Sequence, residues 1–287
     1  GAVSTFTLEM MMQDRKALQG GTSHYLGQNF AKASNIRFSN KEGQTEYGYT
    51  TSWGVTTRLI GGMVMCHGDD DGLRLPPRIA AKQIVIIPFV PKPELENQVF
   101  AYADQLAAQL RAVQYHGRNL SVHVDKREKR GGEKNWEWIK KGVPLRIEVG
   151  PRDLENHVAM VCRRDKPHKE KTSIHIDQLS SECLRMLEEI QTHLYQQARQ
   201  SRDQNIRTDI HTFEQMKQFF TPKNPDRPEI HGGFVLAKWC GDAETEKMLD
   251  ELKVSIRCLP IDQSGTEGRC ILTGKPATLD AIFAKSY

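Results

Sequence analysis

The pattern of apolar and polar residues changes several times over residues 47–89. Residues 47–53 are rich in aromatic and β-branched side chains, which predicts a strand that ends at Gly54. Thr56 can cap a helix after it. Apolar residues recur there at helical spacing, so we expect one helix face to be buried, formed by Leu59, Ile60, Met63, Val64 and His67. The continuous apolar run at 83–89 predicts a buried strand of the parallel kind.

Strand-like and helix-like segments alternate after this run. The pattern predicts helices at 94–113 and 133–141, strands at 119–124, 145–149, 156–163 and 171–176, and a helix from Leu179 towards Arg207. Such alternation is typical of an α/β domain, here with a mixed sheet.

A third part begins at His211. We expect helices at 213–220 and 243–252, a proline-rich loop at 221–228, and strands at 233–239, 255–259, 269–273 and 281–284, which make a small α+β unit. Pro76 and Pro77 exclude helix and end the first part. We therefore expect three domains, at 1–80, 81–205 and 206–287.

Composition and charge narrow the function. Hydrophobic residues make up 38% of the 287, and no run approaches the roughly 18 apolar residues of a membrane span, so we expect no membrane partner. The net charge is +4, but residues 126–171 alone hold 14 Lys and Arg against 8 Asp and Glu, a net +6. The basic surface is therefore confined to the middle domain.

The cysteines indicate a reducing compartment. Six lie far apart, without a CxxC pair, in a chain too large to need disulfides. We therefore expect the protein to be cytoplasmic.

Residues 19–27 contain paired glycines beside polar side chains and predict a glycine-rich turn. One interpretation is a loop held by local hydroxyl hydrogen bonds. The other is a ligand site, because Gly20 and Gly21 let the backbone approach a ligand closely.

Arg58 lies in the first turn of the predicted helix, where the helix dipole disfavours a cation. A guanidinium beside free helix N–H groups suits a phosphate. The run Asp69, Asp70, Asp71 could bind a metal, but three adjacent carboxylates do not all converge on one ion, so a solvated loop is favoured.

Within residues 126–153, cations alternate with Trp136 and Trp138. This composition suits RNA, since phosphates take the charge and unpaired bases stack on aromatic faces. A solvated helix with packed tryptophans explains it equally well.

Four blocks in this order resemble the prolyl-tRNA synthetases of the archaeal and eukaryotic type, which are class IIa aminoacyl-tRNA synthetases. EMMMQDRKALQGGTSHYLGQNFAKA is similar to the segment before motif 3, and SWGVTTRLIGGMVMCHGDDDGLRLPPRIA to motif 3 itself. GVPLRIEVGPRDLE and the closing FAKSY are similar to the anticodon-binding and C-terminal domains.

The resemblance implies the end of a class II antiparallel catalytic sheet, an α/β anticodon-binding domain with a mixed sheet, and a small α+β C-terminal domain. It implies ATP-dependent activation of proline, with Mg²⁺, and transfer of the prolyl group to tRNA(Pro) by a homodimer. Motifs 1 and 2 of that family are expected before residue 1, so we expect a fragment that is inactive alone.

The resemblance also assigns site residues. Arg58 would be catalytic, and ATP would be bound by Gln19, Thr22, Thr56 and Arg58. Proline would be bound by His24, Ser52, Trp53 and Gly54. The tRNA anticodon would be bound by Arg127, Lys134, Glu137 and Arg146. Three positions depart from the family pattern, namely Arg15, Glu133 and Asn135.

The C-terminal domain of such proteins often carries a four-cysteine zinc site. Cys240 and Cys270 keep the first cysteine of each ligand pair, while Thr245 and Thr273 stand at the second. Two thiolates do not complete a tetrahedral site, so we expect no structural zinc.

An alternative of another class is a non-catalytic tRNA-binding or regulatory paralogue on the same scaffold. The joint presence of Gln19, Thr22, His24, Trp53 and Arg58 speaks against it. A general α/β nucleotide-binding enzyme fits less well, because neither a P-loop nor a GxGxxG motif is present.

Overall fold

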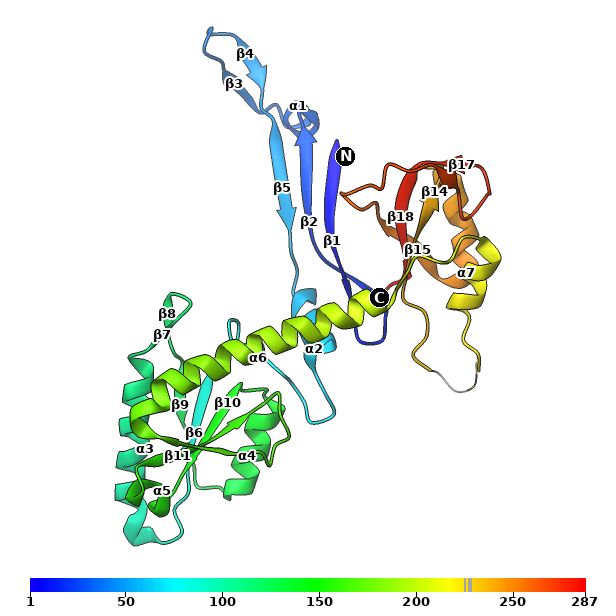
Figure 1. Ribbon diagram of the computed structural model, residues 1–287. Helices are drawn as coiled ribbons and strands as arrows, with labels where there is room; N and C mark the ends of the chain where they lie inside the picture. Colours follow the sequence, from blue (N-terminus) through cyan, green and yellow to red (C-terminus); the bar gives the residue numbers. More distant parts are fainter. Residues whose placement is uncertain (225, 227–228) are drawn as a thin grey trace. The chain divides into compact units, whose positions relative to one another are not determined.

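The computed structural model describes residues 1–224, 226 and 229–287 (Figure 1). The chain divides into two compact units, one made of Gly1–Cys66 with Gln200–Tyr287 and the other of His67–Arg199. Each unit has its own hydrophobic core. Several antiparallel and mixed sheets are present, which confirms the predicted combination of α/β and α+β architecture.

The first unit begins with an antiparallel sheet in the order β1-β2-β5, formed by β1 (Ser4–Met11), β2 (Ala17–Gly27) and β5 (Thr50–Gly54). Between β2 and β5 lie a short helix α1 (Asn29–Ala33) and the hairpin of β3 (Arg37–Ser39) and β4 (Thr45–Tyr47), as Figure 1 shows. The prediction of a glycine-rich turn at 19–27 was wrong. The glycine pair lies inside β2, where the register shifts between Leu8 and Glu9 of β1, because a β-bulge accommodates the extra residue.

Helix α2 (Arg58–His67) packs on one face of this sheet. Gly62 allows the close approach, since an added Cβ would meet Leu18 at 3.0 Å and Met10 at 3.1 Å. The expected burial of the apolar helix face was wrong for three of its residues: Leu59, Ile60 and Val64 are 40%, 64% and 38% exposed. The close contacts at Gly62 are with Met10 of β1 and Leu18 of β2.

The rest of the first unit is the small α+β part. Its sheet has the order β13-β14-β18-β15, with β13 (Ile206–Arg207), β14 (Phe234–Trp239), β18 (Leu279–Lys285) and β15 (Val254–Cys258). Helix α7 (Phe213–Phe220) starts at Thr212, whose side chain accepts from the backbone N–H of Gln215. The segment Ala243–Leu252 forms a 3₁₀ helix.

Two predicted bounds in this part were wrong. The strand expected at 269–273 is only β16 (Gly268–Arg269), paired with β17 (Pro276–Ala277), because the chain turns after Cys270. The helix expected to reach Arg207 ends earlier, since Ile206 pairs with Phe234 in a parallel strand. Part of the predicted loop at 221–228 lies outside the described residues.

The second unit contains a mixed sheet in the order β12-β11-β10-β6-β9. Strands β9 (Val122–Val124), β6 (Ile84–Pro88) and β10 (Leu145–Val149) are parallel, whereas β11 (Val158–Arg163) and β12 (Thr172–His175) are antiparallel. Every residue of β6 is buried, which confirms the predicted buried parallel strand.

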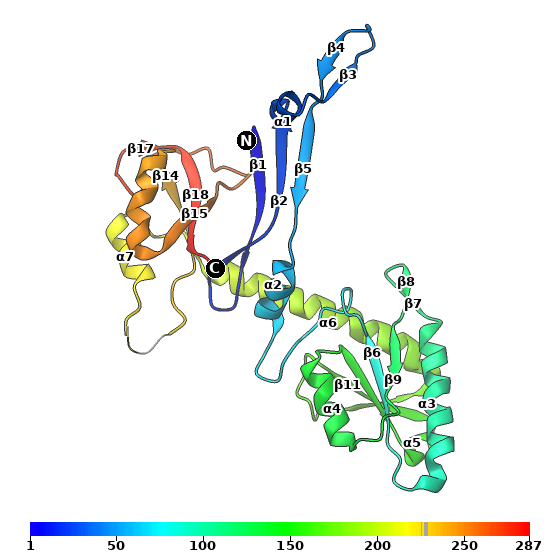
Figure 2. The same ribbon diagram turned by 180° about the vertical axis from the view of Figure 1, so that it is seen from behind.

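Helices cover both faces of this sheet (Figures 1 and 2). Ile84 and Ile86 pack with α3 (Glu96–Arg111) and α6 (Ile176–Gln204), whereas Val85 and Ile87 pack with Trp138 of α4 (Gly131–Lys140). Smaller elements complete the unit: η1 (Pro93–Leu95), the pair β7 (Gln114–Tyr115) and β8 (Arg118–Asn119), and α5 (Pro151–Glu155).

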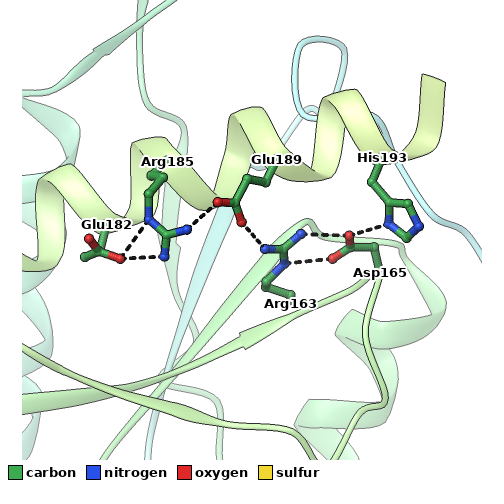
Figure 3. Close-up of polar contacts among 6 residues, drawn as sticks. All are labelled: Arg163, Asp165, Glu182, Arg185, Glu189 and His193. Atoms are coloured by element: carbon green, nitrogen blue, oxygen red, sulfur yellow. Dashed lines mark hydrogen bonds and ion pairs between the residues drawn. The ribbon is translucent and has the colours of Figure 1, made fainter. Parts of the chain in front are cut away.

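A chain of charged side chains ties α6 to the end of β11 (Figure 3). Arg163 donates to both carboxylate oxygens of Asp165 at 2.9 Å and also pairs with Glu189 of α6. His193 lies 2.8 Å from the same Asp165 carboxylate. These contacts fix the position of α6 over the sheet beyond what its apolar face provides.

Candidate active-site face and anticodon interface

The bulge in β2 places three of the predicted ligand residues on one sheet face. Side chains of a regular strand alternate between faces, so Gln19 and Thr22 would point to opposite sides without an extra residue. Across the bulge, Gln19 pairs with Glu9 and Thr22 pairs with Thr7, and these two partners share a face. His24 pairs with Thr5 and therefore joins them.

Hydroxyl groups hold the imidazole of His24. Its Nδ1 lies 2.9 Å from Oγ1 of Thr5 and its Nε2 lies 2.9 Å from Oγ1 of Thr22. In β5, Ser52 pairs with His24 and Gly54 pairs with Thr22, so both belong to the same face. A Cβ at Gly54 would come within 3.1 Å of the Thr22 hydroxyl, so glycine keeps this part of the face open.

The structure does not bring Trp53 to this face. Trp53 pairs with Ser23, which points to the opposite side of the sheet, and its side chain is 75% exposed. Arg58 is exposed at the start of α2, and its backbone N–H donates to Oγ1 of Thr56 at 3.2 Å, which confirms the predicted cap. Within the described residues the Arg58 guanidinium forms no ion pair.

The predicted anticodon residues lie in α4, which holds Lys134 and Glu137, and beside it, since Arg127 precedes the helix and Arg146 belongs to β10. Arg127 donates to the two carboxylate oxygens of Asp125, from Nε at 2.8 Å and from Nη2 at 2.7 Å, and its Nη1 lies 2.7 Å from Glu137. Burial favours the neutral form of Asp125, but hydrogen bonds from Arg127 and Trp138 outweigh burial and lower the pKa of Asp125 well below 3.8.

Lys134 and Arg146 are buried. Lys134 donates to the backbone carbonyl oxygen of Asp125 at 3.0 Å, and only 5% of this residue is exposed. Arg146 is 1% exposed, and its Nε donates to Oδ1 of Asn135 at 3.2 Å. Burial lowers the pKa of Arg146, and within the described residues its Nη1 has no hydrogen-bond partner.

Two pockets flank these residues. Arg127 and Lys134 line a pocket of about 600 Å³ whose apolar wall includes Phe89 and Phe100. Arg146 lines a second pocket, of about 350 Å³, with Trp136 and His168, whose rings lie 5.5 Å apart. Trp136 is 44% exposed, whereas Trp138 is buried against the sheet. The two tryptophans therefore divide between a surface role and a core role.

Glu137 is ion-paired. Both Lys129 and Arg127 hydrogen-bond to its carboxylate and lower its pKa. The ion pair with Glu137 also orients Arg127, because the Arg127 guanidinium lies between the carboxylates of Asp125 and Glu137.

The predicted solvated loop is exposed at Asp69 and Asp70 and half-buried at Asp71. The Asp69 carboxylate accepts two hydrogen bonds from Arg164, one of them at 2.8 Å, and its backbone pairs with Gly72. Among the described residues, no group of three or more His, Cys, Asp or Glu side chains is placed to hold a metal ion.

Hydroxyl groups bond locally at Thr245 and Thr273, where the expected four-cysteine pattern is interrupted. Thr245 accepts from Nε1 of Trp239 at 3.0 Å and donates to the backbone oxygen of Asp242 at 2.6 Å. Burial opposes the thiolate of Cys270, but hydrogen bonds from the Thr273 side chain and nearby backbone N–H groups lower the pKa of Cys270. The absence of zinc from this protein stays a prediction.

Sequence reasoning missed several residues of these sites. Asp125 was not singled out, because a lone aspartate at a strand end carries no pattern that reports burial. Thr5, Thr7 and Glu9 did leave a signal, since polar residues alternate with apolar ones along β1 and so share a face.

Comparisons with known proteins identify the family of the chain. Residues 83–186 match the family described as "Anticodon binding domain", and residues 228–287 match "Prolyl-tRNA synthetase, C-terminal". The chain is 69% identical over 287 residues to the proline–tRNA ligase of Protochlamydia amoebophila, covering 100% of this chain and 57% of that protein. It is 47% identical over 292 residues to proline–tRNA ligase 2 of Anaeromyxobacter dehalogenans, with the same two coverages.

The antiparallel sheet and the small α+β part of the first unit, together with the anticodon-binding match in the second unit, therefore define part of an aminoacyl-tRNA synthetase. The chain belongs to the prolyl-tRNA synthetase family, and it spans 57% of the length of the first two relatives. The predicted family and fold class are thus confirmed. Within the described residues, no helix combines the length and the hydropathy needed to cross a bilayer.

Proposed function

We propose that the protein of which this chain forms a part is an ATP-dependent proline–tRNA ligase. The carboxylate of proline attacks the α-phosphorus of ATP, which gives prolyl-adenylate and releases pyrophosphate. A ribose hydroxyl of the terminal adenosine of tRNA(Pro) then attacks the prolyl carbonyl carbon, and AMP leaves. Both steps depend on positioning and charge stabilisation rather than on a protein nucleophile.

One observation carries this proposal: the β2 bulge gathers Gln19, Thr22 and His24 on one face beside Ser52 and Gly54. A polar face with an open glycine edge suits a small amino acid and a nucleotide. Gln19, Thr22 and Thr56 would bind ATP, and the exposed Arg58 would hold its triphosphate. His24, Ser52 and Gly54 would contact proline.

Trp53 fits this arrangement less directly, because its side chain lies on the other sheet face. We propose that it reaches proline only from the rim of the site. Mg²⁺ would neutralise part of the triphosphate charge when the nucleotide is bound. The reaction would take place in the cytoplasm.

The second unit would bind the anticodon of tRNA(Pro). The pockets lined by Arg127 and by Arg146 offer cations beside Phe89 and Trp136, which suits phosphates and unstacked bases. Glu137 and the buried Arg146 would select bases, since both carry hydrogen-bonding groups of fixed orientation.

The apolar side chains exposed on β1 and α2 support a further contact. Phe6 and Leu8 are 54% and 69% exposed, and Ile60 is 64% exposed. Large apolar side chains exposed together on adjoining elements suit an interaction site. We propose that a segment of the full-length protein, corresponding to the part of the relatives that this chain does not cover, packs there. We also propose that the full-length protein forms a homodimer.

The test is proline-dependent exchange of pyrophosphate into ATP. It uses a fusion in which the part of the Protochlamydia relative that this chain does not cover is joined to this chain. The fusion should catalyse exchange with proline and not with glycine, whereas this chain alone should give only background. A folded fusion that binds tRNA but shows no exchange would favour the non-catalytic paralogue.

A further inference from the structure

A buried ion pair joins the small α+β part to the active-site face. Arg257 of β15 donates to Oε2 of Glu9 in β1, from Nε at 3.0 Å and from Nη2 at 2.9 Å. The side chains of Arg257 and Glu9 are only 16% and 4% exposed. Both residues lie in the first unit.

Two β-bulges bring this pair together. The register of β15 shifts between Ile256 and Cys258, so Arg257 is the extra residue of that strand. The register of β1 against β2 shifts at Glu9. Bulges redirect a side chain out of the regular alternation, and here both irregularities coincide with the ends of one ion pair.

The pair continues into the active-site face through hydrogen bonds. The hydroxyl of Thr7 donates to Oε1 of Glu9 at 2.9 Å, and Nε2 of Gln19 donates to Oγ1 of Thr7 at 3.2 Å. An ionised carboxylate only accepts hydrogen bonds, so the Thr7 hydroxyl must donate to Glu9 and accept from Gln19. The amide group of Gln19 is thereby turned with its nitrogen towards Thr7.

We propose that Arg257 is a positioning residue for nucleotide binding, acting through Glu9 and Thr7 on the amide orientation of Gln19. The amide oxygen of Gln19 is then presented to an N–H or O–H donor of the nucleotide. This inference rests on the proposed function for the identity of that ligand. An ion pair that served only to attach the α+β part would not need the two further hydrogen bonds, from Thr7 to Glu9 and from Gln19 to Thr7.

Each link has a variant that breaks it alone. Thr7→Val removes the hydroxyl and leaves the pair of Arg257 and Glu9 in place. Glu9→Gln keeps the shape but can donate as well as accept, so the direction of the bonds is no longer fixed. Arg257→Met removes the cation. The matched control is Arg207→Met, because Arg207 is exposed in the same unit and pairs with Asp209.

In the fusion described above, pyrophosphate exchange should show different effects of the variants on the KM for ATP and on the KM for proline. Each of the three variants should raise the KM for ATP roughly tenfold, the effect of about one hydrogen bond, with the KM for proline changed less than about twofold. Arg207→Met should change neither. In a Gln19→Ala background, Arg257→Met should add nothing to the KM for ATP, because the group it orients is gone.

A second readout uses this chain without any fusion. Proton exchange of the Gln19 side-chain NH₂, followed by NMR, should be slow in the unaltered chain and fast in Thr7→Val. If Arg257→Met lowers the melting temperature but leaves the KM for ATP unchanged, the pair only attaches the α+β part and the proposal fails. If the unaltered fusion shows no exchange activity, the proposed function fails, and the NMR comparison still decides whether Gln19 is oriented by Thr7.

Discussion

Arg127 and Asp125 face each other as a two-point ion pair, with Nε and Nη2 of the arginine at 2.8 and 2.7 Å from the two carboxylate oxygens. The Asp125 side chain is fully buried, whereas that of Arg127 is 42% exposed. The buried carboxylate therefore fixes the guanidinium at the mouth of a pocket before any RNA arrives. Such preorganisation limits the entropy lost when a ligand binds.

Replacing this carboxylate should reduce stability. Asp125→Asn removes the charge that accepts from Arg127 and from Nε1 of Trp138, which lies 2.8 Å away. We expect the free energy of unfolding to fall by about 1.5–3 kcal/mol, measured by urea denaturation. The matched control is Asp104→Asn, because Asp104 pairs with Lys126 at the surface and should matter by less than about 0.5 kcal/mol. Equal effects of the two changes would contradict the role given to Asp125.

The same carboxylate should make stability depend on acid. Because the folded protein lowers the pKa of Asp125 below 3.8, the unfolded chain binds more protons than the folded one as the pH falls. The stabilisation is present above that ordinary pKa and is lost as the pH falls below about 4 towards the lower pKa of the folded state. The stability difference between the unaltered chain and Asp125→Asn should therefore shrink on acidification. A difference that grows would show that the pKa is raised instead.

Glu137 should control selectivity among tRNAs. Glu137→Gln weakens its hold on Lys129 and Arg127, which increases non-specific attraction to phosphates and leaves Arg127 less well oriented. We expect the ratio of affinities for cognate and non-cognate tRNA to fall, measured by fluorescence anisotropy with this chain. Lys140→Ala, at an exposed lysine, should instead lower the affinity for all tRNAs evenly. It should also reduce the salt dependence of that affinity by the amount expected for about one phosphate contact. If Glu137→Gln leaves the ratio of the two affinities unchanged, the second unit binds tRNA only through its basic surface and Glu137 has no part in selectivity.

The type and order of the elements could be predicted because periodicity reports burial directly. The strands β6 and β10 and the helix α7 followed from apolar runs and repeats in the sequence. The bulge at Gly20 could not be predicted, because paired glycines favour a turn and a bulged strand alike. Only the partner strand, with Glu9 opposite Gln19, distinguishes the two.

The burial of polar side chains could not be predicted from the sequence either. Lys134 and Arg146 read as surface cations in the sequence, yet contacts from distant positions, such as Asn135 to Arg146, enclose them. Patterns along the sequence do not report such contacts between residues of different elements. The exposure of the apolar face of α2 could not be predicted for a different reason. An amphipathic pattern shows that one helix face is apolar, but it does not show which other residues cover that face.

Folding of the small α+β part should not require zinc. Thr245 and Thr273 make local hydrogen bonds where cysteines would complete a four-thiolate set. We expect elemental analysis to find no tightly bound zinc, and chelators to leave the melting temperature unchanged. The double change Thr245→Cys with Thr273→Cys should introduce chelator-sensitive zinc binding. One zinc per unaltered chain that resists chelators would refute the prediction.

Arg58 should act on the nucleotide and not on tRNA. In the fusion, Arg58→Ala removes one donor to the charge that develops on the phosphates, so we expect pyrophosphate exchange to slow roughly 10²–10³-fold. The affinity for tRNA should not change, because Arg58 and the anticodon unit belong to different parts of the chain. Lys32→Ala, at an exposed lysine of α1, provides the control. Normal exchange by Arg58→Ala would assign that arginine to packing alone.

The most direct measurement is the charging of tRNA by the fusion with radioactive proline. We predict that prolyl-tRNA accumulates only when ATP and tRNA(Pro) are both present. Replacing the anticodon of that tRNA, with its acceptor stem kept, should abolish charging. A folded fusion that binds tRNA(Pro) but forms no prolyl-tRNA, or one that charges both tRNAs equally, would contradict this prediction.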